Sequence, residues 1–581
     1  MSSVREFIDA RDFLLSAENY EEAKAGFNWP APENFNWALD YFDQLADKRT
    51  NPALEYVDDR GVEKKVSFQR MKERSSRVAN LFRIVGLRKG DRVLVMLPNK
   101  IELFETVLGA MKVGCVIIPA STLLTSEDVK DRITRGQVRC VIADDRLVPT
   151  IENSIPVGKG ITMINLGGEL KGWVPLSRAD SEPATFKSEE KFSLKDELLI
   201  YFTSGTTARP KLVLHTYGSY PIGHLSTMYW IGIKPGDVHY NISAPGWAKY
   251  AWSSIFGVWN AEATSFVYNY TGKFNQKEVL RMIEEHKIRT LCAPPTVWRF
   301  LLLENLKQYN FALREVVSAG EPLNPEIIQK VRDAAGLTVR EGFGQTETTL
   351  QVGTFPGMSV KAGSMGVEAP GYEIAIVNDD HATVPNRTEG MVAIRVKPKR
   401  PIGLMEGYID PREKNVEVFI GDWYLTGDLA YKDEQGYFWF IGRSDDVFKS
   451  SDYRISAFEL ESELMAHPSV TEVAVVASPD KLRGYVPKAI ITLRPEVKPS
   501  RELAVEIFKF TRDRMAPYKR PRIIQFNQEL PKTVSGKIKR TDLRRIEIDL
   551  RNANRRTQDE YFESDFPELR SERDKTGKET Q

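Results

Sequence analysis

Two hydrophobic patterns divide most of the chain. Between residues 67 and 300, amphipathic helical stretches alternate with short strands that are apolar throughout, such as 91–98, 116–120 and 138–145. Strands without a polar face, separated by helices, are typical of a parallel sheet covered on both sides. Beyond residue 360 the strands become short and alternating, as in 371–380 and 389–397, which indicates an antiparallel subdomain.

A separate unit is predicted from residue 444. Helical patterns at 458–468 and 502–515 alternate there with strands at 471–479, 488–495 and 522–531. We therefore predict an α/β protein whose large N-terminal domain has mainly parallel, helix-flanked sheets plus an antiparallel subdomain, followed by a small α+β domain. The expected parts are an N-terminal extension (1–34), the large domain (35–443), the small C-terminal domain (444–545) and a charged, disordered tail (546–581).

Composition excludes several classes of protein. Lys and Arg number 81 against 80 Asp and Glu, so no overall positive field recruits nucleic acid or an anionic membrane. No run reaches the ~20 apolar residues of a membrane helix. The acidic N-terminus, with Glu6 and Asp9, argues against a targeting peptide. Three widely spaced cysteines, Cys115, Cys140 and Cys292, are expected to be reduced and buried. We predict a cytoplasmic protein without a membrane span or a nucleic-acid partner.

The strongest chemical signal is a loop directly after the apolar stretch 198–202. Residues 203–211 read Thr-Ser-Gly-Thr-Thr-Ala-Arg-Pro-Lys. Small hydroxyl residues and a glycine let N–H and O–H groups surround phosphate oxygens, and Lys211 adds positive charge. The spacing of a Walker loop is absent. The pattern favours phosphate binding over the alternative, a Ser/Thr-rich surface turn.

Five further motifs follow in an order that resembles the adenylate-forming (AMP-binding) superfamily. They are Ser318-Ala-Gly-Glu-Pro322, Glu341-Gly-Phe-Gly-Gln-Thr-Glu347, Tyr424-Leu-Thr-Gly-Asp428, Gly442-Arg-Ser-Asp-Asp446 and Pro531-Lys-Thr-Val-Ser-Gly-Lys537. The resemblance covers residues 35–545. It is strongest to medium-chain acyl-CoA synthetases and the related aryl- and branched-acid CoA ligases. Residues 246–252 also resemble the corresponding segment of that subgroup.

The resemblance implies binding of ATP, Mg²⁺ and coenzyme A. By position it assigns catalysis to Lys537, Thr206 and Glu347, the metal to Thr206 and Glu347, and the hinge of a mobile small domain to Asp445. The implied ATP/AMP site consists of Thr203, Ser204, Gly205, Thr206, Thr207, Lys211, Gly320, Glu321, Pro322, Glu341, Gly342, Phe343, Gly344, Gln345, Thr346, Asp428, Arg443 and Lys537.

The same resemblance implies the remaining contacts and the reaction. Coenzyme A is expected at Ser451, Asp452, Tyr453, Arg454, Arg483 and Arg512. The acyl pocket is expected at Trp247, Tyr240 and Trp252, which are also ordinary core residues. The implied activity activates a short- or medium-chain, branched or aromatic acid as an acyl-adenylate and transfers it to coenzyme A. Family members also suggest a homodimer.

Three positions depart from the family's pattern. Ala208 stands where the phosphate loop usually has glycine, and Ala244 stands where relatives commonly have aspartate. Asp452 replaces a glycine near the path of the pantetheine arm, where its charge would repel a thiolate. Two alternatives therefore stay open. The adenylate is passed to a carrier-protein thiol or released, or the chain is a weakly catalytic nucleotide-binding protein.

Overall fold

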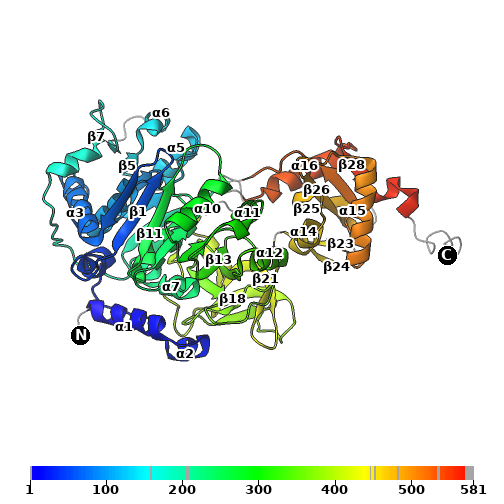
Figure 1. The fold of residues 1–581 in the computed structure, drawn as a ribbon, viewed down its shortest axis with the longest axis horizontal. Helices are drawn as coiled ribbons and strands as arrows, with labels where there is room; N and C mark the ends of the chain where they lie inside the picture. The colour runs from blue at the N-terminus through cyan, green and yellow to red at the C-terminus, as the bar shows by residue number, and fades with distance from the viewer. Residues whose placement is uncertain are drawn as a thin grey trace. The chain divides into compact units, whose positions relative to one another are not determined.

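The computed structural model describes residues 3–156, 160–203, 209–444, 446–450, 453–480, 483–517, 519–532 and 537–569. Its contacts divide the chain into two compact units (Figure 1). The first comprises residues 1–375, 393–425 and 433–439, and the second comprises 376–392, 426–432 and 440–581. The second unit thus takes in three stretches that precede the boundary predicted at residue 444, namely 376–392, 426–432 and 440–443.

One large sheet of the first unit is mostly parallel. Its order is β16-β15-β14-β13-β12-β10-β11-β1-β2. The pairs from β14 through β1 are parallel, and antiparallel strands lie only at its two edges. The strands are β1 (Pro52–Asp58), β2 (Glu63–Ser67), β10 (Val238–Asn241), β11 (Thr264–Asn269), β12 (Thr290–Cys292), β13 (Glu315–Ala319), β14 (Arg340–Gly344), β15 (Leu350–Gly353) and β16 (Val367–Glu368).

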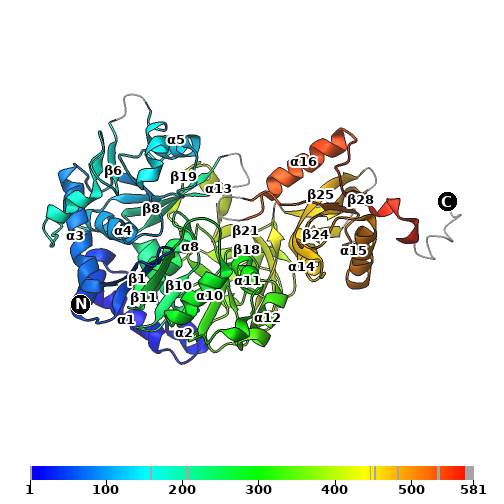
Figure 2. The same cartoon turned by 45° about the horizontal axis from the view of Figure 1, so that its top comes forward.

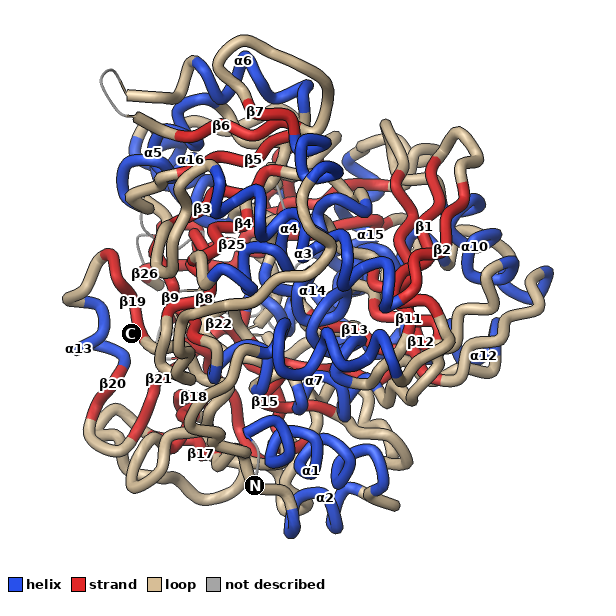
Figure 3. The backbone as a smooth tube through the Cα atoms, turned by 90° about the vertical axis from the view of Figure 1, so that its left-hand side faces the viewer, coloured by secondary structure: helices blue, strands red, loops and turns tan. Residues whose placement is uncertain are grey.

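A second sheet of this unit has the order β19-β9-β8-β4-β3-β5-β6-β7, and Figure 3 shows β3 to β7 running side by side. It is parallel from β8 to β7, whereas β9 and β19 pair antiparallel at the other edge. The strands are β3 (Arg92–Met96), β4 (Val116–Pro119), β5 (Cys140–Ala143), β6 (Thr162–Asn165), β7 (Val174–Pro175), β8 (Glu197–Thr203), β9 (Lys211–Thr216) and β19 (Gly407–Asp410).

Helices cover these sheets, as the apolar strands require. They are α3 (Phe68–Ile84), α4 (Ile101–Val113), α5 (Ser126–Arg135), α6 (Val148–Glu152), α7 (Leu225–Ile231), α8 (Ala248–Ala251), α9 (Gly257–Asn260), α10 (Gln276–Glu285), α11 (Pro295–Leu301), α12 (Pro325–Ala335) and α13 (Lys414–Val418). Leu280, Leu301 and Ile328, from α10, α11 and α12, belong to one buried apolar cluster with strand residues such as Leu291 and Val316.

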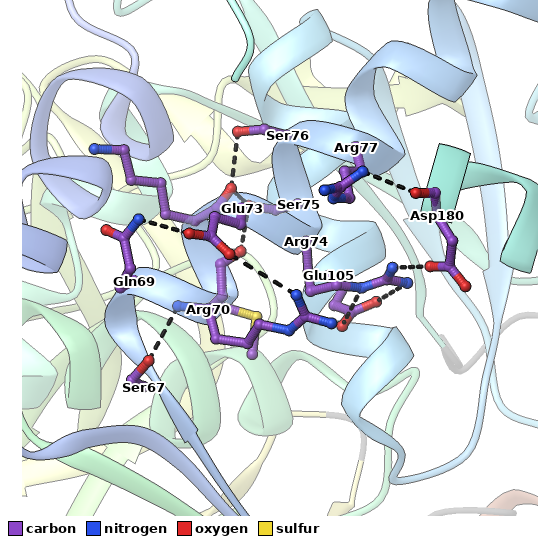
Figure 4. Close-up of polar contacts among 12 residues, drawn as sticks. Ser67, Gln69, Arg70, Glu73, Arg74, Ser75, Ser76, Arg77, Glu105 and Asp180 are labelled. Carbon is purple, nitrogen blue, oxygen red and sulfur yellow. Dashed lines mark hydrogen bonds and ion pairs between the residues drawn. The ribbon is translucent and has the colours of Figure 1, made fainter. Parts of the chain in front are cut away.

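An ion-pair network ties α3 to α4 (Figure 4). The Arg74 guanidinium donates to both carboxylate oxygens of Glu105, each at 3.1 Å. Arg74 also pairs with Asp180. Glu105 is buried, and burial raises the pKa of its carboxyl group. The nearby Arg74 guanidinium acts in the opposite direction but offsets only part of this rise. Such a buried carboxylate depends on its partner, because an unpaired charge in the interior is costly.

The N-terminal residues form part of the first unit. They fold as α1 (Ser3–Ser16) and α2 (Tyr20–Gly26). Phe7 is fully buried, and Arg11 forms an ion pair with Glu262. The ring of Tyr20 stacks on Phe355 with their centroids 5.3 Å apart. The extension is therefore anchored by packing and charge to the large domain.

A five-stranded sheet contains residues of both units. Its order is β17-β18-β21-β20, and β22 pairs with β21. The strands are β17 (Ile374–Val377), β18 (Gly390–Arg395), β20 (Phe419–Ile420), β21 (Trp423–Lys432) and β22 (Phe438–Arg443). The fold class predicted from the sequence, with mainly parallel sheets in the large domain and a smaller C-terminal domain, is confirmed.

The second unit has its own core. Its sheet has the order β25-β26-β27-β28, and β23 and β24 form a separate hairpin. A cluster including Leu460, Ile491 and Ile507 lies between this sheet and α14 and α15. The elements are β23 (Val447–Ser450), β24 (Tyr453–Ser456), α14 (Ala457–Met465), β25 (Val470–Asp480), β26 (Gly484–Leu493), α15 (Arg501–Arg514), β27 (Ile523–Phe526), α16 (Arg540–Asn552) and β28 (Glu560–Phe562).

The prediction of a disordered tail from residue 546 is wrong as far as residue 569. Helix α16 continues to Asn552 and lies against β25 (Figure 2), and β28 pairs antiparallel with β27. Phe566 and Leu569 enter the core of the second unit. The dense charge misled the sequence interpretation because several of these charges are paired: Glu547 and Glu560 both contact the buried Lys488. Residues 570–581 lie outside the described part.

The cysteines and the helices bear on two predictions made from the sequence. Cys115, Cys140 and Cys292 are free and buried, as the sequence predicts. Of the helices among the described residues, none has the length and apolar character needed to cross a membrane.

Candidate active site

A hairpin frames the Ser/Thr/Gly loop. Strands β8 and β9 pair antiparallel, and Thr203 lies directly opposite Lys211. The ends of the loop are thus fixed by a strand pair. Thr203 Oγ1 is buried without a hydrogen-bond partner among the described residues, so it is available to an oxygen-rich ligand. The loop positions Ser204, Gly205, Thr206, Thr207 and Ala208 lie outside the described residues.

Three side chains meet beside this hairpin. The ammonium Nζ of Lys211 lies 3.6 Å from Glu347 Oε1 and donates to the Tyr408 hydroxyl at 3.1 Å. The Tyr408 hydroxyl in turn donates to Glu347 Oε1 at 2.7 Å. Lys211 Nζ also lies 4.6 Å from the centroid of the Tyr408 ring, within the range of a cation–π contact. The structure therefore brings together Lys211 and Glu347, both predicted from the sequence, with Tyr408, which the sequence interpretation missed.

A buried histidine holds the neighbouring residue of the motif. His215 Nε2 lies 2.7 Å from the Thr346 carbonyl oxygen, and Nδ1 lies 3.0 Å from Ser219 Oγ. Because a carbonyl only accepts, Nε2 carries the proton, and the neutral ring accepts from Ser219 at Nδ1. Burial lowers the pKa of His215 to about 4. His215 is thus a neutral anchor for Thr346 that was also missed.

Two segments of the predicted ATP/AMP site lie on adjacent parallel strands. Ser318 in β13 pairs with Glu341 in β14. The Glu341 carboxyl accepts from the Leu323 N–H at 3.1 Å, and burial raises its pKa to about 8. Gly320 has φ +105°, a conformation that favours glycine.

Other residues of the predicted ATP/AMP site are held by neighbouring side chains or partly buried. Glu321 accepts from Thr296 at 3.3 Å, and Gln345 accepts from the Tyr424 hydroxyl at 3.3 Å. Pro322 and Phe343 are half-buried. A Cβ on Gly342 would lie 2.3 Å from the Trp230 ring, so the chain packs closely there.

Asp428 and Arg443, both predicted to bind ATP/AMP, come together in the second unit. Arg443 Nη1 lies 3.4 Å from Asp428 Oδ1. Asp428 is almost fully buried whereas Arg443 is partly exposed. A carboxylate has two acceptor oxygens and is therefore suited to accept hydrogen bonds from vicinal hydroxyls.

The aromatic residues predicted for the acyl pocket have different surroundings. Trp247 lines an apolar cavity of about 30 Å³, together with residues such as Val107 and Tyr250. That space holds roughly one water molecule and is too small for an acid as it stands. Trp252 packs on the 343–350 segment, since a Cβ on Gly344 would lie 2.4 Å from its ring. Tyr240 belongs to a buried core cluster and does not line this cavity.

The predicted coenzyme A and hinge positions are only partly described. Ser451, Asp452 and the hinge residue Asp445 lie outside the described residues, as do the side chains of Tyr453 and Arg454. Arg483 is exposed. Arg512 forms an ion pair with Glu563 at 2.5 Å, so in this structure its guanidinium stabilises the C-terminal segment. Lys537 is exposed in the second unit.

Comparison with known proteins connects this geometry to a family. The family model described as AMP-binding enzyme matches residues 42–409. That described as AMP-binding enzyme C-terminal domain matches residues 459–537. The chain belongs to the AMP-binding enzyme family. Both matches lie within the 35–545 range over which the sequence resembles that family.

Curated relatives of this AMP-binding enzyme are named acyl-CoA synthetases and CoA ligases. The acyl-coenzyme A synthetase ACSM3, mitochondrial, of Mus musculus is 40% identical, and the alignment covers 91% of this chain and 93% of that protein. The 4-hydroxybutyrate–CoA ligase 1 of Metallosphaera sedula is 41% identical with the same two coverages. This AMP-binding enzyme is therefore a member of the acyl-CoA synthetase group, whose reaction type is that of acid–thiol ligases.

Solved structures agree with this membership. The anthranilate CoA ligase AuaEII in complex with anthranoyl-AMP superposes with a TM-score of 0.82 at 28% identity, covering 90% of this chain and 99% of that one. A benzoate CoA ligase from Burkholderia xenovorans LB400 gives 0.77 at 28% identity, covering 88% and 100%.

The described residues fit ATP and Mg²⁺. Mg²⁺ is usually held by one or two carboxylates together with phosphate oxygens rather than by a cage of side chains. Glu347 supplies one such carboxylate, and the buried, unpartnered Thr203 Oγ1 lies at the start of the phosphate loop. Lys211 is a cation at the other end of that loop, as a triphosphate requires.

Proposed function

We propose that this enzyme is an AMP-forming acyl-CoA synthetase that works in two half-reactions. ATP and a carboxylic acid first give an acyl-adenylate and pyrophosphate, and coenzyme A then gives the thioester and AMP. The observation that carries the proposal is the contact of Lys211, Glu347 and Tyr408 beside the hairpin that frames the phosphate loop.

The first half-reaction needs charge stabilisation more than a nucleophile. A carboxylate oxygen attacks the α-phosphorus of ATP, and the pyrophosphate leaves with the electrons of the broken P–O bond. Negative charge on the phosphoryl oxygens is stabilised by preorganised cations and N–H donors. We assign Lys211 to the phosphates and Glu347, with Thr206, to Mg²⁺. Bound Mg²⁺ would supply neutralisation of the triphosphate. Lys537 is assigned to the attacking carboxylate and the α-phosphate.

The second half-reaction is assigned to a different orientation of the part of the chain that follows Asp445. The thiol of coenzyme A attacks the acyl carbon, AMP leaves, and the thiol proton passes to solvent. We propose that rotation about Asp445 withdraws Lys537 and presents the cationic coenzyme A residues. Of the residues predicted for that role, Arg483 has the exposure that binding a phosphate requires.

The substrate is proposed to be a short- or medium-chain, branched or aromatic acid. Two observations support an acyl group with an apolar body: Trp247 lines an apolar cavity, and Trp252 packs on the 343–350 segment. The acids in the names of relatives and structural neighbours, 4-hydroxybutyrate, anthranilate and benzoate, lie in the same size range. A cytoplasmic location and a homodimer remain predictions from the sequence.

A panel of acids tests this function. The enzyme is incubated with ATP, Mg²⁺ and each acid from acetate to decanoate, plus branched and aromatic members, with and without coenzyme A. Pyrophosphate and acyl-CoA are quantified together. We expect equal amounts of the two products with the best acid. The absence of acid-dependent pyrophosphate across the panel would contradict the proposal and favour a non-catalytic nucleotide-binding protein.

The same panel of acids also tests whether the acyl-adenylate is released or passed to an acceptor other than coenzyme A. Pyrophosphate without matching thioester would show that the adenylate is released or needs a carrier-protein thiol. Asp452 motivates this alternative, because a carboxylate there would repel an incoming thiolate. We then expect Asp452→Gly to raise acyl-CoA formation without changing pyrophosphate release. No change in thioester yield would remove Asp452 as the cause.

A further inference from the structure

Tyr408 joins the two charged groups of the phosphate site through a single hydroxyl. Its O–H donates to Glu347 Oε1 at 2.7 Å, and its oxygen accepts from Lys211 Nζ at 3.1 Å. The hydrogen is committed to the carboxylate because a lysine ammonium has no lone pair to accept it. Both contacts are charge-assisted, the stronger class of hydrogen bond.

The second carboxylate oxygen of Glu347 has a different environment. Tyr408 and Lys211 both engage Oε1, whereas no described residue forms a hydrogen bond or an ion pair with Oε2. The backbone of Glu347 is also fixed, since its carbonyl accepts from the Met405 N–H at 2.8 Å. Among the described residues, one oxygen of the carboxylate is therefore held by the protein, and the other has no protein partner.

We propose that Tyr408 is the positioning residue of the metal and phosphate site. It holds Glu347 through Oε1, which would leave Oε2 for Mg²⁺, and it holds the Lys211 ammonium beside that carboxylate. With Mg·ATP bound, the Lys211 ammonium would move from Glu347 to the negatively charged phosphates, while the Tyr408 hydroxyl would remain on the carboxylate. This inference rests on the proposed function and adds a residue to it.

The scaffold around Tyr408 supports this role. Its backbone is clamped on both sides by the Asn415 amide: the Tyr408 N–H donates to Oδ1 at 2.8 Å, and Nδ2 donates to the Tyr408 carbonyl at 2.7 Å. Strand β19, which carries Tyr408, pairs with β9, which carries Lys211. Removal of the hydroxyl alone therefore leaves the ring and the strand pairing in place.

The first unit contains a matched control for this change. Lys361 Nζ lies 4.2 Å from the centroid of the Tyr437 ring and forms an ion pair with Asp433 at 2.5 Å. The Tyr437 hydroxyl donates to the Ser359 carbonyl at 2.9 Å. Tyr437 is thus a buried tyrosine with a lysine over its ring and a single hydroxyl bond, but it has no place in the proposed site.

The test compares the wild-type chain with Tyr408→Phe and Tyr437→Phe. Calorimetry measures binding of ATP with and without Mg²⁺, and acid-dependent pyrophosphate release gives KM for ATP and for the acid. For Tyr408→Phe we expect affinity for Mg·ATP to fall roughly tenfold, because the hydroxyl that orients the Glu347 carboxylate for the metal is lost. Affinity for metal-free ATP and KM for the acid should change less than twofold. Tyr437→Phe should match the wild type, and both variants should melt within a few degrees of it.

Three results would overturn the inference. The first is an equal affinity for Mg·ATP in the two variants. The second is an equal loss of affinity for ATP with and without Mg²⁺ in Tyr408→Phe. The third is a rise in KM for the acid as large as the rise in KM for ATP. A wild-type enzyme that binds Mg·ATP but releases no pyrophosphate with any acid would refute the proposed function instead. The calorimetric comparison of the two variants would then still decide the role of Tyr408.

Discussion

Glu341 and Glu347 belong to one short motif but have different electrostatic surroundings. Glu341 is buried without an ion-pair partner among the described residues, and burial raises its pKa to about 8, so its carboxyl is mostly protonated at neutral pH. Glu347 has the Lys211 ammonium 3.6 Å away and the Tyr408 hydroxyl at 2.7 Å. One carboxyl is therefore structural, and the other is suited to bind a metal ion.

His215 makes folding stability depend on pH. Its pKa is about 4 in the folded chain against 6.5 in the unfolded one, so between these values the unfolded chain binds more protons. Stability from this residue is thus complete above pH 6.5 and is lost as the pH falls toward 4, by up to about 3 kcal/mol. We expect a smaller loss in His215→Gln, because glutamine does not titrate. Urea unfolding of both proteins at pH 5 and pH 7 measures the difference, and equal pH dependence would contradict this role.

The charged residues of the site could be predicted from the sequence, but the residues that contact them could not. Lys211 and Glu347 stand in recognisable motifs. Tyr408 lies 197 residues from Lys211 and 61 from Glu347, and His215 lies 131 residues from Thr346. Nothing in the local pattern of a tyrosine or a histidine shows such a partner. Only the pairing of β19 with β9 brings Tyr408 into reach.

At the scale of secondary structure, local pattern was sufficient where strands and helices are strongly apolar. The stretch predicted at 91–98 is β3, and that at 138–145 contains β5. Pattern failed for the segment beyond residue 545. Its few apolar residues, such as Tyr561 and Phe566, pack on a sheet formed by strands earlier in the chain. Its charges pair with Lys488, 59 and 72 residues earlier, so they are not a sign of disorder.

Removal of this segment should unfold or weaken the second unit. A chain ending at Arg545 loses Glu547 and Glu560, both partners of the buried Lys488, and also loses Phe566 from the core. An unpaired buried charge costs about 3–5 kcal/mol. We expect a chain ending at residue 569 to melt like the full chain and a chain ending at 545 to melt far lower. Equal melting temperatures would show that the segment is dispensable.

Close packing of Trp252 on β14 explains why a glycine stands at position 344 of the 341–347 motif. A Cβ at Gly344 would lie 2.4 Å from the Trp252 ring and 2.5 Å from the Thr349 carbonyl oxygen. Backbone must then shift, so Gly344→Ala should destabilise the fold by about 1–3 kcal/mol and reduce acid activation. Gly168→Ala is the control, because its added Cβ meets open space. Denaturant midpoints of both variants test this account, and an unchanged midpoint for Gly344→Ala would refute it.

At the scale of the whole molecule, the residues assigned to the proposed reaction come from distant parts of the chain. Lys211, Glu347 and Tyr408 belong to the first, and Asp428, Arg443 and Lys537 belong to the second. Residues between Ile455 and Leu569 form a core of their own, and a domain with its own core can move as a body. The proposed two half-reactions in one site call for such a change, because Lys537 is assigned to adenylation alone.

Lys537→Ala should therefore separate the two half-reactions. We expect acid-dependent pyrophosphate release to fall at least a hundredfold, because a cation at the reacting carboxylate and α-phosphate is lost. Conversion of supplied acyl-adenylate to acyl-CoA should remain within a few fold of the wild type. Quenched-flow measurement of each half-reaction tests this, with Lys539→Ala as a nearby control. Equal loss in both steps would contradict the assigned role.

The most direct test of the central claim is to trap the intermediate. The wild-type enzyme is mixed with ATP, Mg²⁺ and its best acid without coenzyme A, and the quenched mixture is analysed by mass spectrometry. We predict acyl-AMP with an equal amount of pyrophosphate, and conversion to acyl-CoA and AMP once coenzyme A is added. Formation of ADP and phosphate in place of acyl-AMP, or thioester formation without an adenylate, would contradict the two-step mechanism.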